Sequence, residues 1–117
     1  MTSILVSFDI DGTLETGDPP GPVTLDLVRQ ARDLGYIIGS ASDRTRSDQQ
    51  AMWDRHGVDV HFVSHKHHLT DIRSRWDCDR FLHIGDTDVD RFYSTQAGFE
   101  FWPVLELPAP GSDGWIL

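Results

Sequence analysis

Short apolar segments alternate with segments of helical spacing along almost the whole chain, and this alternation constrains the fold more than any other feature. Strands are expected at residues 4–8, 36–41, 59–63, 81–85 and 99–102, with helices at residues 24–34, 47–56, 67–76 and 88–97. Strands and helices that alternate at this spacing form right-handed β-α-β units. The sequence therefore predicts an α/β fold with a doubly wound, mostly parallel five-stranded sheet.

Glycines and turn-forming residues mark the ends of the expected elements. Gly35, Gly57 and Gly98 follow three of the helices, at the point where a left-handed residue commonly ends a helix. Residues 15–22 are rich in proline and glycine and are expected to form a loop. Residues 103–117 are expected to form an irregular tail.

The size and composition are those of one small globular domain. A chain of 117 residues is expected to form a single domain, here residues 1–117 with a core at about residues 4–102. No apolar run approaches the roughly 18 residues of a membrane helix, and the N-terminus lacks the features of an export signal. We therefore expect a soluble, cytoplasmic protein without a membrane partner. The single cysteine, Cys78, rules out an internal disulfide and a zinc site built from cysteines.

The net charge of −9 argues against one class of partner. With 10 Lys+Arg against 19 Asp+Glu, the chain lacks the excess of basic residues that gives polynucleotide binding its strength. Nucleic acid is therefore disfavoured as a partner, although the charge alone does not exclude it. Nine of the ten cationic residues are arginines, which draws attention to the one lysine, Lys66.

Polar residues follow four of the expected strands. In chain order they are Asp9, Asp11, Gly12 and Thr13, then Ser42, Asp43 and Arg44, then Lys66, then Asp86, Asp88 and Asp90. Because the carboxyl ends of parallel strands lie at one edge of a sheet, these side chains are expected to meet in one place.

The acidic members of this set predict a cation and a nucleophile. Three or more carboxylates at one site repel one another unless a hard divalent cation is present, and oxygen ligands suit Mg²⁺. A carboxylate such as Asp9 can attack phosphorus, while a second one two residues on, Asp11, exchanges protons with the leaving group and water. Lys66, Ser42 and backbone amides near Gly12 could bind the phosphoryl oxygens.

The residues in this order resemble the motifs of the haloacid dehalogenase superfamily of phosphohydrolases. The first motif, an apolar strand followed by Asp-x-Asp-Gly-Thr-Leu, matches residues 9–14. The second is a Ser or Thr after a strand and matches Ser42. The third is a lysine about 20 residues before the last motif and matches Lys66, and the fourth, Gly-Asp-x-x-x-Asp, matches Gly85, Asp86 and Asp90. The resemblance covers residues 4 to about 102.

This resemblance implies a role for each matched residue. Asp9 would be the nucleophile and Asp11 the general acid/base, which would also offer its backbone carbonyl to the metal. The phosphate-binding residues would be Gly12, Thr13, Ser42 and Lys66, and the magnesium ligands would be Asp9, Asp11, Asp86 and Asp90. The resemblance thus implies an Mg²⁺-dependent phosphomonoester hydrolase that forms an aspartyl-phosphate on Asp9.

In this superfamily, cap domains that select the substrate are inserted after the first motif or after the third strand. Neither place has room for one in this sequence, so the chain resembles the capless type with an open site. Open sites in the superfamily suit large substrates, or small ones when a neighbouring subunit acts as a lid, which predicts self-association or a macromolecular substrate. Residues 35–44 and 98–102 are more weakly similar to the phosphatase domain of polynucleotide kinase/phosphatases.

Three alternatives remain open at this stage. One is a nucleotide or polynucleotide phosphatase of the same fold. Another is a response-regulator receiver domain, which has a similar length, acidity and magnesium site but carries its phosphorylated Asp after the third strand. The last is a binding or scaffold module on an inactive phosphatase fold. The phosphorylated substrate itself is not specified by the sequence.

Several residues near the motifs also have a plain structural interpretation. Ser40 is a rival to Ser42, Asp88 is as well suited to capping the following helix as to the site, and Arg44 is expected to pair with a carboxylate. A zinc site in the run His65-Lys66-His67-His68 is disfavoured because adjacent histidines at a helix start should point in different directions. The four tryptophans, Trp53, Trp76, Trp102 and Trp115, are expected to be packing residues.

Overall fold

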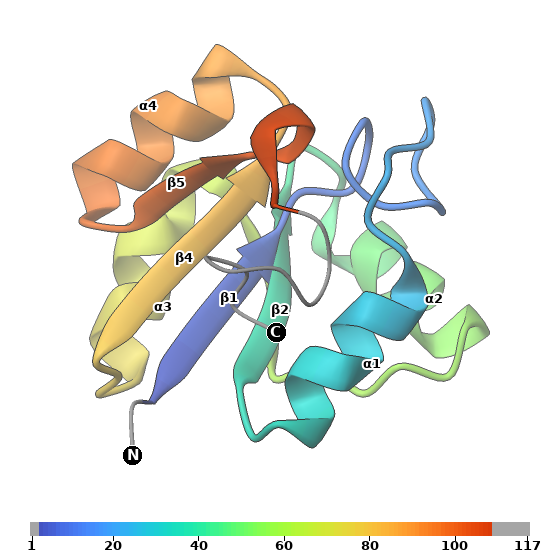
Figure 1. Cartoon of the computed structure of the whole chain (residues 1–117), viewed down its shortest axis with the longest axis horizontal. Helices are drawn as coiled ribbons and strands as arrows, with labels where there is room; N and C mark the ends of the chain where they lie inside the picture. Colours follow the sequence, from blue (N-terminus) through green and yellow to red (C-terminus); the bar gives the residue numbers. More distant parts are fainter. Residues whose placement is uncertain (1–2, 109–117) are drawn as a thin grey trace.

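The chain forms a five-stranded parallel sheet covered by helices on both faces (Figure 1). The computed structural model describes residues 3–108. Its elements are β1 (Ile4–Phe8), α1 (Leu25–Asp33), β2 (Ile37–Ser42), α2 (Arg46–Arg55), β3 (Phe62–His65), α3 (Leu69–Arg75), β4 (Arg80–Gly85), α4 (Asp88–Ala97) and β5 (Glu100–Pro103). Two short 3₁₀ turns, η1 (Lys66–His68) and η2 (Val104–Glu106), complete the described chain.

The strand order is β3-β2-β1-β4-β5, and every pairing is parallel. The chain adds strands outwards from β1 to β3, then crosses back and adds β4 on the other side of β1. This order is that of a doubly wound, Rossmann-like sheet, as predicted. The point where the order reverses lies between β1 and β4, whose carboxyl ends point to the top of Figure 1.

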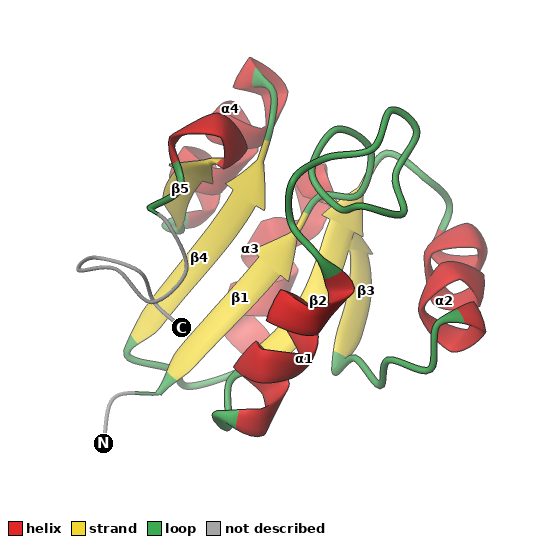
Figure 2. Cartoon of the chain, turned by 45° about the vertical axis from the view of Figure 1, so that its right-hand side comes forward, coloured by secondary structure: helices red, strands yellow, loops and turns green. Residues whose placement is uncertain are grey.

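Alternate residues of the central strand face the two apolar cores. Ile4, Val6 and Phe8 of β1 pack with buried residues of α1 and α2, whereas Leu5 packs with α3 and α4. All five residues of β1 are buried, since helices cover both faces of the sheet (Figure 2). This explains why the sequence of β1 is almost continuously apolar instead of alternating.

Glycines end the helices where the sequence predicted. Gly35, Gly57 and Gly98 all have positive φ angles, of 89°, 67° and 80°, which glycine adopts without steric cost. Helix α1 begins after Thr24, whose hydroxyl accepts a hydrogen bond from the Leu27 N–H at 3.2 Å.

The third strand lies later in the sequence than predicted. We expected it at residues 59–63, but β3 spans Phe62–His65. The side chain of His61 explains the shift, because its Nδ1 accepts the Ile38 N–H at 3.0 Å and so takes the place of a ladder hydrogen bond. The backbone ladder between β2 and β3 begins one residue further on, with Gly39 opposite Phe62.

The segments after β3 and after β5 also differ from the prediction. The helix expected at residues 67–76 is the 3₁₀ turn η1 followed by the shorter α3. Residues 103–108 are not simply irregular: Pro103 ends β5, and Val104 of η2 is buried in the core. Proline is tolerated in β5 because that strand lies at the edge of the sheet. The rest of the expected tail, residues 109–117 with Trp115, lies outside the described residues.

The described part of the chain contains no cap domain. Only a loop at residues 9–24 separates β1 from α1, and only η1 separates β3 from α3. Within residues 3–108, no helix combines the length and hydropathy that a bilayer span requires.

Candidate active site

Three of the predicted site residues converge where the order of the sheet reverses. Asp9 directly follows β1, Asp86 directly follows β4, and Lys66 is the first residue of η1 after β3. Together with Ser42 at the end of β2, they line one pocket of about 150 Å³. Ligands of open α/β sheets bind at this position, so the sheet brings these distant residues together as predicted.

Asp9 is a buried carboxyl group at the centre of the site. Its side chain is 4% exposed, and one oxygen lies 3.3 Å from Lys66 Nζ. The other oxygen accepts the N–H of Ile10 at 2.8 Å. Burial and the nearby Asp90 raise the pKa of Asp9 from 3.8 to about 8, even though Lys66 opposes the shift. The site therefore needs more positive charge than Lys66 supplies if Asp9 is to be ionised at neutral pH.

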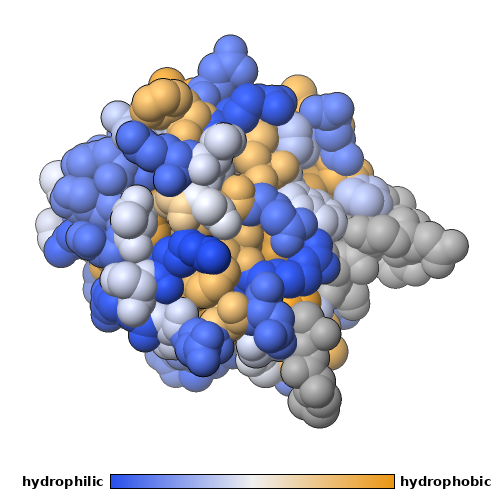
Figure 3. Space-filling view, turned by 90° about the vertical axis from the view of Figure 1, so that its left-hand side faces the viewer, coloured by the Kyte–Doolittle hydropathy of each residue, from blue (hydrophilic) through white to orange (hydrophobic). Residues whose placement is uncertain are grey.

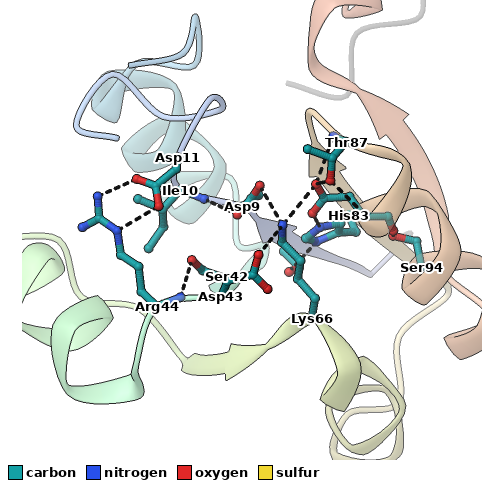
Figure 4. A network of polar contacts seen from close by, with 12 residues as sticks. Asp9, Ile10, Asp11, Ser42, Asp43, Arg44, Lys66, His83, Thr87 and Ser94 are labelled. Carbon is teal, nitrogen blue, oxygen red and sulfur yellow. Dashed lines mark hydrogen bonds and ion pairs between the residues drawn. The ribbon is translucent and has the colours of Figure 1, made fainter. Parts of the chain in front are cut away.

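Lys66 lies among three carboxylates (Figure 4). Its Nζ is 3.3 Å from Asp9, 3.4 Å from Asp90 and 3.5 Å from Asp43. Burial alone would lower the pKa of Lys66, but the three carboxylates outweigh it and raise that pKa above its ordinary value. The ammonium group is thus charged and faces the pocket from the side opposite to Asp11.

Asp90 is fully buried, and both of its oxygens are already engaged. Oδ1 lies 2.7 Å from His83 Nε2, and Oδ2 accepts hydrogen bonds from the Thr87 N–H and hydroxyl at 3.1 and 2.8 Å. His83 is held in turn by Ser7, whose Oγ lies 2.9 Å from Nδ1. Although burial opposes ionisation, the hydrogen bond from His83 helps to hold the pKa of Asp90 at about 2. Asp90 therefore serves to hold Lys66 and the start of α4 in place.

The cap of α4 differs from the interpretation offered for Asp88. Thr87 is the N-cap, and it exchanges hydrogen bonds with Asp90 in a capping box. Asp88 lies one residue further on, in the first turn of α4, and is exposed. The interpretation of Asp88 as the cap of α4 was therefore wrong, because Thr87 is the N-cap.

Asp11 faces the other side of the pocket, where Arg44 holds it. The Arg44 guanidinium donates to its two oxygens at 2.6 and 3.2 Å, and the N–H of Asp18 donates to one of them at 2.8 Å. The hydrogen bond from Arg44 lowers the pKa of Asp11. The predicted pairing of Arg44 with a carboxylate is confirmed, and its partner is the predicted acid/base.

The two candidate serines of β2 have different surroundings. Ser42 lines the pocket, and its Oγ accepts the N–H of Arg44 at 3.1 Å. Ser40 instead donates to Gln49 at 2.7 Å and accepts from the indole of Trp53 at 3.0 Å, within the core. Ser42 is therefore the serine that can reach a ligand.

Gly12 and Thr13 help to shape the site without lining the pocket. The Gly12 N–H donates to the carbonyl of Pro19 at 2.6 Å, and the Thr13 N–H to that of Ile10 at 3.1 Å. Gly12 has a φ of 76°, which favours glycine, and a Cβ there would also displace the carboxylate of Asp86. The Thr13 hydroxyl is buried without a hydrogen-bond partner among the described residues. Phosphate binding by these two residues stays a prediction.

Three acidic residues form a group that could hold a divalent cation. Asp9, Asp86 and Asp90 each place an oxygen within 4.8 Å of the others, although the oxygens of Asp90 also accept hydrogen bonds from His83 and Thr87. The carboxylate of Asp86 lies close to Gly12. A set of oxygen donors with open space on one side fits Mg²⁺. The Asp11 carboxylate is not part of this group.

Sequence reasoning named Asp43, which lines the pocket, but missed two contributors to the site. Thr87 also lines the pocket, and His83 supports it through Asp90. The spacing of Thr87 and Asp90 resembles a capping box, and this pattern could have indicated the contact between these two residues. His83 carries no such signal, because its contact with Asp90 depends on how α4 packs on β4.

The histidine run does not diverge as expected. His65, His67 and His68 place ring nitrogens within 4.8 Å of one another, and the rings of His67 and His68 are 4.1 Å apart between centroids. The expectation that these side chains point in different directions was wrong, since the run bends from β3 into a 3₁₀ turn instead of starting a regular α-helix.

Comparison with known proteins gives no relative. No family model matches the chain, and neither a curated protein nor a solved structure matches it.

Proposed function

We propose that the chain is an Mg²⁺-dependent phosphomonoester hydrolase of the haloacid dehalogenase type. The observation that carries the proposal is the contact between the buried Asp9 carboxyl group and Lys66 in a pocket that also holds Asp86 and Ser42. A buried carboxylate next to a fixed cation is suited to nucleophilic attack on a phosphoryl group whose oxygens that cation binds.

The pocket has the size of a reacting group, not of a whole substrate. Its volume of about 150 Å³ is below the roughly 300–1,000 Å³ of sites that enclose a small molecule. A phosphoryl group fits between Asp9, Ser42 and Lys66, while the rest of the substrate lies outside. This favours a monoester, in which the phosphoryl group is terminal.

The reaction takes place in two steps on these residues. Asp9 attacks phosphorus, the bond to the ester oxygen breaks, and Asp11 gives the departing alkoxide a proton. Water then attacks the aspartyl-phosphate, Asp11 takes its proton, and inorganic phosphate leaves with Asp9 restored. Lys66 and Ser42 bind the phosphoryl oxygens throughout, so charge that develops there is stabilised.

Asp9 and Asp86 are the residues that would hold Mg²⁺, with Asp90 directly behind them. The ion would supply the positive charge that favours ionised Asp9 and offsets the charge of the phosphoryl oxygens. Asp11 must exchange its hydrogen bond with Arg44 for one with the leaving group or water. The hydrogen bond from Arg44 lowers the pKa of Asp11, so release from Arg44 is what lets Asp11 carry the proton that it donates in the first step and regains from water in the second.

The strand order argues against the receiver-domain alternative. Receiver domains have the order 2-1-3-4-5, whereas this sheet has β3-β2-β1-β4-β5. In addition, the candidate nucleophile follows β1 here, and β3 leads to a lysine.

The test is release of phosphate from a panel of phosphorylated metabolites, nucleotides and oligonucleotides, with Mg²⁺ or with chelator. We expect Mg²⁺-dependent turnover in the wild type and none in Asp9→Asn. Asp86→Asn should require much more Mg²⁺, whereas Asp88→Asn, a matched change two residues away and outside the pocket, should behave as wild type.

Two outcomes would contradict the proposal. Turnover by Asp9→Asn at the wild-type rate would remove Asp9 as the nucleophile. The folded wild type could also release no phosphate from any substrate of the panel but form a stable acyl-phosphate when treated with acetyl phosphate. This result would favour a scaffold that is phosphorylated without turnover. Preference for oligonucleotides over all other esters would instead identify the polynucleotide phosphatase alternative.

A further inference from the structure

Three histidines form a second cluster of metal-ligating side chains, separate from the carboxylates. His65 ends β3, and His67 and His68 belong to η1. Their ring nitrogens lie within 4.8 Å of one another, and the ring centroids are separated by 4.1 to 5.7 Å. The proposed phosphatase mechanism uses none of the three.

The backbone of this turn is held firmly on its inner side. Lys66 lies between the histidines in the sequence, but its side chain is 5% exposed and extends inwards to Asp9 and Asp90. The N–H of Leu69 donates to the Lys66 carbonyl and closes the turn. The histidines remain on the outer side, where His67 is exposed and His65 and His68 are half-buried. The three histidine side chains therefore converge on a turn whose backbone is held in place by Lys66.

We propose that His65, His67 and His68 bind one Zn²⁺ ion, with solvent in the fourth coordination position. Neutral imidazole is a preferred ligand of zinc, and three histidines with one open position form a known class of zinc coordination. Binding requires the three rings to rotate so that their nitrogens come closer, to the spacing of a tetrahedral site. The proposal does not depend on phosphatase activity.

The two clusters differ in the metal that they select. Mg²⁺ prefers oxygen ligands, which the site at Asp9 and Asp86 provides. Imidazole nitrogens favour zinc and other late transition metals instead. The histidine site should therefore bind Zn²⁺ in the presence of saturating Mg²⁺, and this condition also keeps Zn²⁺ away from the carboxylates.

Arg46 provides a charge that opposes the metal. Its guanidinium lies 3.4 Å from Nδ1 of His68, so it competes for a ring nitrogen and repels a cation. Removal of this charge should tighten Zn²⁺ binding. A merely structural role of the histidines gives no reason for such a gain.

The decisive experiment is calorimetric titration of the full chain with Zn²⁺ alone as the probe, in saturating Mg²⁺. We expect one ion per chain. His67→Ala and His68→Ala should each weaken binding by at least about tenfold, and Arg46→Gln should strengthen it. His56→Ala, which changes a histidine at the end of α2 that does not belong to the cluster, is the matched control and should bind as wild type.

A second readout identifies the ligands directly. In ¹⁵N NMR spectra of the histidine rings, one equivalent of Zn²⁺ should shift the signals of His65, His67 and His68 and leave those of His56 and His83 unchanged. This measurement needs no substitution, so it remains decisive if His65→Ala, at the end of a strand, fails to fold.

The proposal is overturned by any of three results. These are the absence of stoichiometric Zn²⁺ binding, equal binding by wild type and His67→Ala, and ring shifts spread over all six histidines. Weaker binding by Arg46→Gln would contradict the assigned role of that residue and of the nitrogen it contacts.

Discussion

At the scale of single residues, the burial of Asp9 makes the site costly to maintain without a cation. Its pKa of about 8 means that the folded chain holds a proton there that the unfolded chain loses near pH 3.8. A carboxyl group whose pKa is raised by folding adds to the free energy of unfolding at any pH below its pKa in the unfolded chain. This contribution falls as the pH rises towards its pKa in the folded chain. Asp90 stays ionised throughout this range, because its pKa is about 2.

This predicts that the metal-free protein becomes less stable from pH 5 to pH 8.5. Asp9→Asn should remove most of the decline and gain about 1 to 3 kcal/mol at pH 8, even though it abolishes turnover. Urea unfolding in chelator at several pH values measures both effects, and Mg²⁺ should reduce the wild-type slope. A wild-type stability that is flat or rises over this range would contradict the assigned state of Asp9.

His83 is the second residue on which the site depends. It is fully buried and joins Ser7 on β1 to Asp90 on α4. His83→Ala would leave the Asp90 carboxylate without its shortest hydrogen bond, and we expect a loss of about 2 to 4 kcal/mol in unfolding free energy. Ser7→Ala removes only the bond to the other ring nitrogen and should cost about 1 kcal/mol.

Chemical denaturation at pH 7 separates these two changes. Equal losses in the two variants would mean that the contact with Asp90 contributes little. If His83→Ala is too unstable to study, His83→Gln keeps a donor in the same place and should recover part of the loss.

At the scale of elements, the loop after β1 forms a wall of the pocket. Pro19 of this loop lines the site, and its carbonyl accepts the Gly12 N–H. The Gly21 N–H donates to the Leu14 carbonyl at 2.8 Å, and Gly21 lies against the backbone of Thr13. The loop thus packs tightly on the first motif, although its sequence indicates only turns.

We therefore predict that Gly21→Ala displaces this loop. Its Cβ would collide with backbone atoms of Thr13, which have no freedom to rotate away. Such overpacking costs about 1 to 3 kcal/mol, and turnover of the best ester in the panel should fall with it. Pro20→Ala, at an exposed neighbouring position, is the control for both thermal unfolding and activity. Wild-type behaviour of Gly21→Ala would show that the wall is free to move.

The elements also show what could be predicted from the sequence. Strand β1 and helix α4 match the predicted bounds because apolar runs and terminal glycines mark them clearly. The start of β3 could not be found in this way, because a side chain, His61, replaces a backbone partner. For the site, the ends of the strands gave Asp9, Ser42, Lys66 and Asp86. The supporting contacts of His83 depend on packing between elements, which no local pattern encodes.

At the scale of the whole molecule, the candidate site is a pocket of about 150 Å³ with no cap domain among the described residues. The face shown in Figure 3 is mainly hydrophilic, with apolar areas broken up by polar side chains. The exposed large apolar residues are scattered over α1, α4 and η2, as Leu34, Val89, Phe92 and Leu105. If the proposed phosphatase function holds, we expect selectivity among substrates to come from outside the pocket, through a second copy of the chain or through a macromolecular substrate.

We therefore predict that the monomer discriminates only weakly among small phosphomonoesters. Because remote parts of such esters contact no cap, binding energy from them cannot lower the barrier, and kcat/KM values should agree within about tenfold. The measurement is kcat/KM for esters of different size at several protein concentrations, with the oligomeric state followed by light scattering. Selectivity that grows as the chain self-associates would identify a neighbouring copy as the lid. A preference of more than about 100-fold for one small ester, held by a strict monomer, would contradict this expectation, because about 3 kcal/mol of transition-state binding would then come from contacts of a single chain outside the pocket.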